Sequence, residues 1–464
     1  NQLKKPVLVV EAVSITHKFA NDRILSFMVQ GIMDNIDDFK EHSVSYMPWV
    51  EIKQKAGGKM LRSLSEKSVC VIIDDYPTYT PSKIRDAAGR NLQVRVDAVD
   101  SNGIFPMNWA EKEFTTAYSF RKYAQKNILD AFHTIPEKNP TQHREGDLRV
   151  SEEIIADLKD DLGFESTPLE WLWRVAEGGT VGNQAMEEFP IDHTVPAVIT
   201  SKGGVNEARI RLQKFLNYRL NKYSTDRNNP DKPAVSGLSP WLHFGHISSY
   251  EIIQNVLSKE NWSPDSLNHE DTGKGTRSGW WGVSESASSF LDQIITWREL
   301  GFNFAYNRED HATVETIPNW AKLSMKEHLN DDRIIYSLEE LERAETHDEI
   351  WNAAQRELLR TGQMHNYMRM LWGKKILEWS PSPEIAAENM IYINDKWALD
   401  GRDPNSYTGI FWVLGRHDRA WGPERPIFGK VRYMSSESAY RKLKLKNYLQ
   451  KYAKDENITL AKFG

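Results

Sequence analysis

Six tryptophans gather between Trp351 and Trp421, among acidic, amide and guanidinium side chains. An indole gives up an electron readily, and its flat face stacks well on a nucleotide base. A core that needed only apolar packing would use leucine and isoleucine instead. This stretch therefore indicates redox chemistry, base stacking, or both. The six residues are Trp351, Trp372, Trp379, Trp397, Trp412 and Trp421.

Three of these tryptophans have a spacing that suits electron transfer. Trp372 and Trp379 are seven residues apart, so they lie on one face of a predicted helix, two turns apart. Trp351 belongs to the preceding predicted helix, before a break at Gly362. A hairpin of the two helices would align the three indoles. An aromatic stripe in the core is the commoner explanation of such a pattern, and spacing alone does not separate the two.

Another tryptophan, Trp297, follows Gln293 by four residues and shares a helix face with it. The indole could stack on a flat ligand, while the amide offers both a donor and an acceptor to a ring edge. The alternative is an ordinary helix running from the surface to the core, with Arg298 paired to a glutamate.

The stretch from Tyr223 to Pro240 contains small hydroxyl residues and a glycine just before a predicted helix. Backbone N–H groups in such a segment can bind an anion, for example a diphosphate. A simple helix N-cap at Ser239, with Pro240 as the first helical residue, explains those two residues equally well.

A turn-rich loop follows at Asp400–Asn405, whose carboxylates could accept hydrogen bonds from ring N–H groups or ribose hydroxyls. The spacing of a calcium-binding loop is absent. His243 and His246 lack a third ligand, and one cysteine, Cys70, cannot build a cysteine zinc site. We therefore expect no metal.

The overall composition is that of a water-soluble globular protein of two or three domains, with 464 residues, 40% hydrophobic and 27% charged. No apolar run approaches about 18 residues, so we expect no membrane span. The first residues lack the apolar core of a signal peptide. The single Cys70 excludes an internal disulfide and fits a reducing compartment.

The charge is unevenly distributed. A net charge of −6 argues against a chain that binds nucleic acid over its whole surface. Residues 415–454, however, contain eleven Lys and Arg against three acids, with aromatic residues between them. This basic segment favours a polyanion-binding surface. A solvated helix face is the usual explanation of a lone basic run.

The order of predicted elements indicates an α/β part followed by a helical part. Short apolar runs before residue 100 predict buried parallel strands in an open sheet, with a helix over Ile24–Phe39 between the first two. The predicted strands are Val7–Val10, Val44–Ile52, Val69–Ile73 and Leu92–Val99. Beyond Gly204 the pattern is helical. The predicted helices are Asn206–Asn221, Ser248–Ser258, Ser284–Tyr306, Asp348–Arg360, Met364–Glu378 and Pro383–Asp395.

Taken together, these residues resemble the photolyase/cryptochrome family, and specifically its class II cyclobutane pyrimidine dimer photolyases. The likeness covers most of the chain and is strong from Tyr223 to Tyr452. The strings that carry it are Asp348 to Trp379, Ile391 to Asp395, Leu399 to Asn405, His417 to Gly422 and Phe428 to Met434.

The resemblance implies an N-terminal Rossmann-like α/β domain (1–130), a connector (131–205) and an all-helical domain (206–464) that holds a U-shaped FAD. It implies Trp351, Trp372 and Trp379 as the electron chain, with the order of Trp351 and Trp379 left open. Asn394 matches the residue that faces the reactive nitrogen of the flavin. The other implied flavin contacts are Tyr223, Arg227, Val235, Ser236, Gly237, Leu238, Ser239, Arg298, Asp400, Asp403 and Asn405.

The implied substrate is UV-damaged double-stranded DNA, bound by a monomer. Light-excited reduced FAD would donate an electron to the thymine dimer, the cyclobutane ring would split, and the electron would return. The implied activity is that of a deoxyribodipyrimidine photo-lyase, in the cytoplasm of a bacterium or archaeon or in a eukaryotic nucleus. Residues implied to hold the flipped dimer are Trp297, Met370 and Trp412, and those implied to face the DNA are Asp418, Arg419, Arg432 and Arg441.

The sequence departs from the class II pattern in two places. Gln293 replaces a glutamate that hydrogen-bonds the dimer, with Asp292 beside it, and an amide cannot transfer a proton. A first strand and helix have no counterpart, so an antenna chromophore of the deazaflavin or folate type is not assigned. Gln293 favours the alternative of a cryptochrome-like photoreceptor without repair activity. A third reading is a light-independent flavoprotein that binds nucleic acid.

Overall fold

The computed structural model describes residues 3–51, 56–142, 147, 149–162, 167–232 and 234–454. The chain divides into two compact units whose segments alternate along the sequence. The first unit comprises Asn1–Ser101, Thr134–Ile210 and Trp241–Ile247, and the second comprises Asn102–His133, Arg211–Pro240 and Ser248–Gly464. The predicted domain boundaries after residues 130 and 205 stay a prediction.

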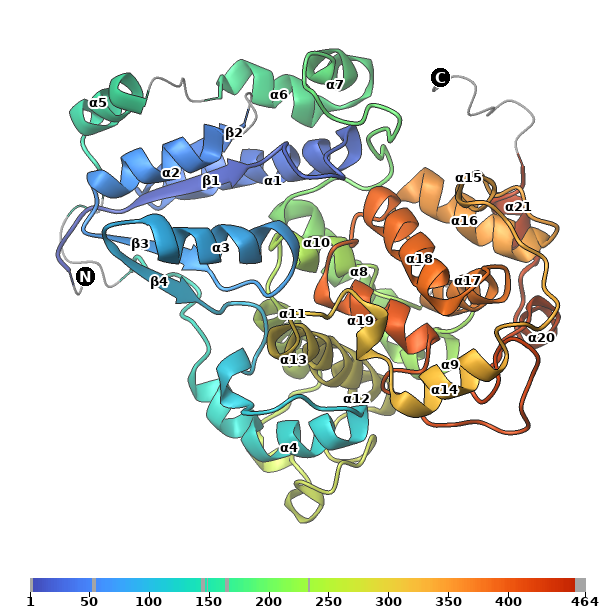
Figure 1. Cartoon of the computed structure of the whole chain (residues 1–464). Helices are drawn as coiled ribbons and strands as arrows, with labels where there is room; N and C mark the ends of the chain where they lie inside the picture. Colours follow the sequence, from blue (N-terminus) through green and yellow to red (C-terminus); the bar gives the residue numbers. More distant parts are fainter. Residues whose placement is uncertain are drawn as a thin grey trace. The chain divides into compact units, whose positions relative to one another are not determined.

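Four parallel strands in the first unit confirm the predicted strand segments (Figure 1). Strand β1 (Leu8–Val13) pairs with β2 (Ser45–Val50), and β3 (Cys70–Asp74) pairs with β4 (Arg95–Val99). Among the described residues the strands form two parallel two-stranded sheets, so the predicted open parallel arrangement is present as two pairs of strands.

The prediction that the Val69–Ile73 run is buried is wrong. Val69 is 57% exposed and Ile72 is 68% exposed. Helix α3 (Tyr79–Asn91) packs against both β3 and β4 and contacts this pair from one side. Since successive side chains of a strand point to opposite faces, half of an apolar run stays exposed when only one face is covered.

The core of the first unit lies between β1, β2 and helices α1 (Asp22–Glu41), α6 (Leu169–Glu177) and α7 (Gly179–Met186). Helix α1 begins where the Asn21 side chain accepts a hydrogen bond from the Ile24 N–H at 3.0 Å, as an N-cap does. The unit also contains α2 (Ala56–Glu66) and α5 (Glu152–Leu162).

The second unit is helical, which confirms the mixed fold of an α/β part and a helical part. Helices α8 and α10 each include residues of both units. The remaining helices are α4 (Ala117–His133), α8 (Val205–Tyr218), α9 (Tyr223–Asp226), α10 (Ser239–His243), α11 (Ser249–Lys259), α12 (Glu285–Leu291), α13 (Arg298–Asn307), α14 (Asn319–Glu327), α15 (Leu338–Glu342), α16 (Glu349–Thr361), α17 (Asn366–Glu378), α18 (Pro383–Trp397), α19 (Pro404–Val413), α20 (Ser436–Lys442) and α21 (Lys446–Lys451).

Capping residues fix the ends of these helices and so determine which residues each helix contains. Asp348 begins α16 by accepting hydrogen bonds from the Ile350 and Trp351 N–H groups at 3.1 and 3.0 Å. Gly362 ends it with φ of 67°, which glycine adopts without strain. Asp403 begins α19, with Pro404 as its first residue. Helix α17 packs against α16, α18 and α19 at the centre of the unit.

Within the part of the chain that the structure describes, no helix has the length and apolar character to cross a membrane. The same residues include no group of three or more His, Cys, Asp or Glu placed to hold a metal ion.

Candidate functional site

Two indoles from different helices stack face to face in the second unit. The ring centroids of Trp297 and Trp412 are 4.6 Å apart, and the ring planes differ by 11°. Both side chains are half-buried. The Trp412 Nε1–H is buried and has no hydrogen-bond partner among the described residues. The two tryptophans implied to hold a flipped base pair thus contact each other face to face.

A close contact between α13 and α19 holds the two indoles at this distance. A Cβ on Gly301 would come within 2.6 Å of the Asn405 Oδ1 atom and 3.1 Å of the Thr408 hydroxyl. Only a glycine lets the helices approach this closely. Asn405 is itself fixed, because its backbone N–H and its side-chain amide both donate to the Asp403 carboxylate, at 2.8 and 3.0 Å.

The helix that carries Gln293 and Trp297 is not a continuous α-helix. Residues Asp292–Trp297 form a π-helix between α12 and α13, and the Arg298 N–H donates to the Gln293 carbonyl five residues back. A π-turn closes one residue later than an α-turn. Trp297 therefore stands slightly less than one turn after Gln293, whereas an α-helix was predicted. Short π-helical segments often occur at functional sites.

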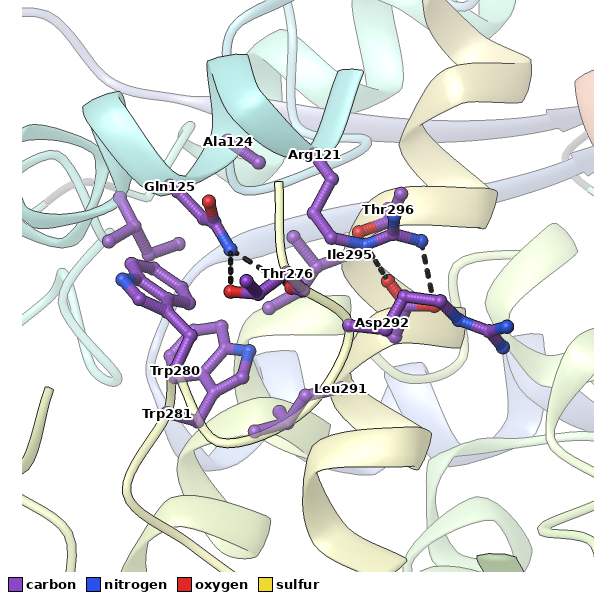
Figure 2. Close-up of a pocket in the computed structure, with 12 residues that line it drawn as sticks. Arg121, Ala124, Gln125, Thr276, Trp280, Trp281, Leu291, Asp292, Ile295 and Thr296 are labelled. Atoms are coloured by element: carbon purple, nitrogen blue, oxygen red, sulfur yellow. Dashed lines mark hydrogen bonds and ion pairs between the residues drawn. The ribbon is translucent and has the colours of Figure 1, made fainter. Parts of the chain in front are cut away.

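The π-helix packs on α4 through a buried ion pair. Arg121 on α4 donates to both carboxylate oxygens of Asp292, with its Nε at 2.7 Å and its Nη2 at 3.1 Å (Figure 2). Both side chains are less than 9% exposed. Beside the pair lies a small cavity, lined also by Gln125 and Trp280, with room for about one water molecule. The Asp292 carboxylate is thus committed to Arg121, and it does not replace the glutamate that is missing at Gln293.

The three tryptophans predicted as an electron chain are all buried. Trp351 contacts each of the other two. The Trp351 Nε1–H donates to the Trp372 carbonyl at 3.0 Å. The Trp351 and Trp379 ring centroids are 5.4 Å apart, at 73°. The Trp372 Nε1–H donates to Gln355 Oε1 at 2.8 Å. Trp351 therefore contacts both of the others, the Trp372 backbone and the Trp379 ring, a link that the spacing in the sequence could not provide.

A charged cluster lies where α17, α18 and the loop before α19 meet. The Arg369 Nη2 is 3.0 Å from a carboxylate oxygen of Asp400. Asp395 is buried and accepts hydrogen bonds from the Asn394 amide at 3.2 Å, the Arg402 N–H at 2.8 Å and the Tyr407 hydroxyl at 3.2 Å. Burial raises the pKa of Asp395, and Arg402 opposes this effect. The cluster offers carboxylate and amide groups that could orient a polar ring system.

The predicted anion-binding segment lies beside a histidine that the sequence reasoning did not assign. Neither ring nitrogen of His365 has a partner of good hydrogen-bond geometry among the described residues, although the ring is only 9% exposed. Burial lowers its pKa to about 4, against a smaller opposing effect of the Arg227 backbone. A Cβ on Gly237 would lie 3.8 Å from the Gln363 side chain, so the 235–239 loop and the 363–365 turn are neighbours.

These residues fit the diphosphate of a dinucleotide such as FAD. A buried donor without a partner costs about 1–3 kcal/mol, a cost that a bound acceptor would remove. The Arg227 guanidinium lies 5.6 Å from the centre of the Tyr223 ring, and Tyr223 is itself buried. Arg298 has a different set of contacts, because its Nη1 donates to the Asn102 carbonyl at 2.6 Å and its guanidinium stacks on Phe302.

Part of the basic segment forms a charged aromatic cluster around Trp421. Arg432 donates to both oxygens of Asp418, at 2.8 and 3.0 Å, and lies 4.1 Å from the centre of the Trp421 ring. Arg419 lies 4.8 Å from the same ring. Burial raises the pKa of Asp418, but its hydrogen bonds from Arg432, Arg419 and Trp421 outweigh this, and the net shift is downward. Arg441 is exposed near the end of α20.

A buried lysine joins α17 to the end of α19 and was not singled out in the sequence. Lys374 is 1% exposed, and its Nζ donates to the Val413 carbonyl. It lies one turn after Met370, which is half-buried on the same face of α17. Among the other tryptophans, Trp397 donates its Nε1–H to Glu342 at 2.6 Å, an arrangement that anchors α18 to α15.

Comparison with known proteins gives relatives over nearly the whole chain, although no family model matches. A deoxyribodipyrimidine photo-lyase of Methanothermobacter thermautotrophicus is 31% identical over 454 residues, which cover 97% of this chain and 88% of that protein. A Synechocystis cryptochrome has a TM-score of 0.67 at 15% identity, covering 99% of this chain and 85% of the other. An archaeal photolyase from Sulfolobus tokodaii with two FAD molecules has a TM-score of 0.61 at 14% identity, covering 100% and 87%.

Proposed function

Because this chain belongs to the photolyase/cryptochrome family, we propose that it is a class II-like photolyase, which binds FAD and splits cyclobutane pyrimidine dimers in UV-damaged DNA under blue light. The observation that carries the proposal is the stacked pair of Trp297 and Trp412 at 4.6 Å. Each of these indoles could stack on a base of a flipped lesion once their mutual contact is given up, which supports a role in holding the dimer.

Energetics favour exchange of the indole–indole contact for a flipped lesion. The stacked pair is worth about 0.5–1.5 kcal/mol. Base–aromatic stacking is worth about 1–3 kcal/mol per base, and each base of the dimer would contact an indole. Flipping costs a few kcal/mol and least at a lesion that already pairs badly. The gain at the two indoles therefore offsets most of the cost at a dimer, and less of it at an intact pair.

The residues proposed to hold FAD fall into two groups, one for its diphosphate and one for its ring and ribityl chain. Arg227, the 235–239 loop and His365 would bind the diphosphate through a guanidinium, backbone N–H groups and an imidazole. Asn394 and the carboxylates of Asp400 and Asp403 would orient the ring and ribityl side. When bound, FAD supplies one-electron chemistry driven by light. In this assignment the Tyr223 ring packs against Arg227. Arg298 helps to position α13 through Asn102 and Phe302 and does not touch the flavin.

We propose that electrons move from Trp379 to Trp351, then to Trp372, and from there to the flavin. Their burial supports this role, since water is kept from the three indoles, of which none is more than 3% exposed. The hydrogen bond between Trp372 Nε1 and Gln355, at 2.8 Å, fixes the orientation of the indole proposed to be nearest the flavin.

The DNA backbone is proposed to bind along the basic segment. Arg419 and Arg432 flank Trp421, and Asp418 holds Arg432 in place. These side chains would position the duplex by phosphate contacts, while the Trp297 and Trp412 indoles would select the lesion. Arg441 on α20 would extend the same charged surface.

The second candidate is a flavin photoreceptor without repair activity, and Gln293 is the observation that favours it. An amide can hydrogen-bond a dimer but cannot share a proton with its radical anion. Asp292 cannot take over, because Arg121 holds it at 2.7 and 3.1 Å. We therefore expect Gln293→Glu to raise the repair yield under the first proposal.

The test compares binding of two oligonucleotides, identical except for one thymine dimer, in the dark. The proposal predicts tighter binding of the damaged duplex, and loss of that preference in Trp297→Ala. Trp397→Phe is the matched control, since Trp397 anchors α18 to α15 through Glu342, away from the stacked pair in sequence and in its contacts. Equal affinity for both duplexes in the wild type would contradict repair and leave the photoreceptor.

A further inference from the structure

A tyrosine and a histidine extend the row of buried indoles to the protein surface. The Tyr336 ring centroid lies 5.3 Å from that of Trp379, at 72°, and the His347 ring lies 5.4 Å from it, at 63°. Trp379 is 2% exposed, Tyr336 is half-buried and His347 is exposed. Together with Trp351, these residues make a continuous aromatic path from the interior of the second unit to solvent.

The hydrogen bonds direct the phenolic proton of Tyr336 toward the imidazole. The Tyr336 oxygen is 2.6 Å from His347 Nδ1 and accepts the His347 backbone N–H at 3.1 Å. With one lone pair of the phenol oxygen engaged by that N–H, its O–H points to Nδ1. The imidazole must then carry its hydrogen on Nε2, because a neutral histidine has one donor and one acceptor nitrogen.

The charges around Trp379 favour moving a positive charge away from the indole. Lys375 Nζ lies 5.5 Å from the centre of the Trp379 ring. Glu378 at 2.9 Å and Asp348 at 3.9 Å pair with this ammonium and offset part of its field. An oxidised indole at this buried position is a cation with little solvation. An imidazolium at the exposed His347 is a cation in water, so transfer outward relieves the burial cost.

We infer that Tyr336 and His347 form the proton-coupled outer end of the electron chain, with His347 as the base. The inference rests on the proposed function, in which Trp379 is oxidised while the flavin is reduced by light. The Trp379 radical cation takes one electron from Tyr336, and the phenolic proton moves to His347 Nδ1. The products are a neutral indole, a neutral phenoxyl radical and an imidazolium. A soluble thiol then returns one electron to Tyr336, while solvent takes the proton from His347 and the phenol recovers one.

This arrangement would make light-driven reduction of the flavin hard to reverse. An electron returning to Trp379 from the flavin side finds no hole, because the hole has become a phenoxyl radical whose proton has already left. Reversal then requires the proton to come back from an exposed imidazole that exchanges with water. His347 would act through Tyr336, as a positioning and proton-accepting residue.

The experiment is laser flash photolysis of the FAD-bound protein without DNA, with radicals followed by transient absorption and EPR. The wild type should show a tyrosyl radical that replaces the tryptophan radical, with slower formation in D2O. His347→Asn keeps a hydrogen-bond acceptor but no base, so tyrosyl formation should slow by about 10²-fold and the tryptophan radical should persist. Tyr336→Phe should abolish the tyrosyl signal. Tyr218→Phe, a change at an exposed residue of α8, is the matched control and should behave as the wild type.

Two results would overturn the inference. One is the absence of a tyrosyl radical in the wild type. The other is an unchanged rate of its formation in His347→Asn, which would mean that histidine has only a structural role. Failure of the proposed function is separate: a protein whose flavin has been reduced chemically with dithionite should repair dimers without this path. If it does not repair them while the tyrosyl radical still forms, the repair proposal fails and the inference about the radical stands.

Discussion

The buried Lys374 should make the free energy of unfolding depend on pH. Its side chain is 1% exposed, and burial lowers its pKa to about 7, with a smaller opposing effect of Asp418 and a reinforcing one of Arg432. In the unfolded chain this lysine keeps its ordinary pKa of 10.5. The difference corresponds to about 4–5 kcal/mol between the charged and the neutral lysine.

The sign follows from proton binding. Between about pH 7 and about pH 10 the unfolded chain holds a proton on Lys374 that the folded chain has released, so the free energy of unfolding rises with pH by up to about 1.4 kcal/mol per pH unit. Replacing the residue by Lys374→Met removes this dependence. Other titrating groups contribute equally to wild type and variant, so the difference in the free energy of unfolding between the two proteins is the quantity to follow.

The assay is thermal or urea unfolding of wild type and Lys374→Met at several pH values from about 7 to about 9.5. The wild type should gain stability relative to the variant as the pH rises. Lys375→Met is the matched control one residue along the chain. Despite burial, its ion pairs with Glu378 and Asp348 raise the pKa of Lys375, so its contribution is fully present below 10.5 and flat in this window. The reasoning would be refuted if the difference in the free energy of unfolding between wild type and Lys374→Met did not change with pH. It would also be refuted if this difference changed equally with pH for Lys374→Met and Lys375→Met.

Three further predictions concern the site. Asp292→Ala should lower the free energy of unfolding by about 3–5 kcal/mol, because it leaves Arg121 buried without its carboxylate; denaturant unfolding checks this, and a double variant Arg121→Met with Asp292→Leu should recover most of the loss. Trp351→Phe should slow photoreduction of the flavin while binding of dimer DNA is unchanged, and equal photoreduction rates would argue against the chain. Trp412→Ala should weaken binding of dimer DNA by about 5- to 150-fold, or about 1–3 kcal/mol, in a fluorescence titration; a change below twofold would exclude stacking at this indole.

Periodic features of the fold were predictable from the sequence. The helices α16 and α17 follow from apolar spacing and from the Asp348 and Gly362 end signals, which act over a few residues. The strand positions followed in the same way from local apolar runs. The exposure of Ile72 did not, because burial of a strand face depends on which other segments cover it, and no local pattern records this.

Site residues were predictable from the sequence only where they belong to a local pattern or to a motif of the family resemblance. The spacing of Trp372 and Trp379 predicted a shared face, but the contacts of Trp351 with both depend on how two helices pack. The commitment of Asp292 to Arg121 joins residues 171 positions apart. The same holds for the buried imidazole of His365, on which the backbone of the distant Arg227 acts. Contacts between distant segments carry no sequence signal without an alignment.

Recovery of thymine absorbance tests the central claim most directly. A thymine-dimer oligonucleotide is bound to the protein with chemically reduced FAD and illuminated with blue light, so that neither the indole chain nor Tyr336 limits the result. The account predicts that the thymine absorbance returns in the wild type and returns with higher yield in Gln293→Glu. No recovery in either protein, with the flavin bound and reduced, would contradict repair and leave a photoreceptor of the same fold.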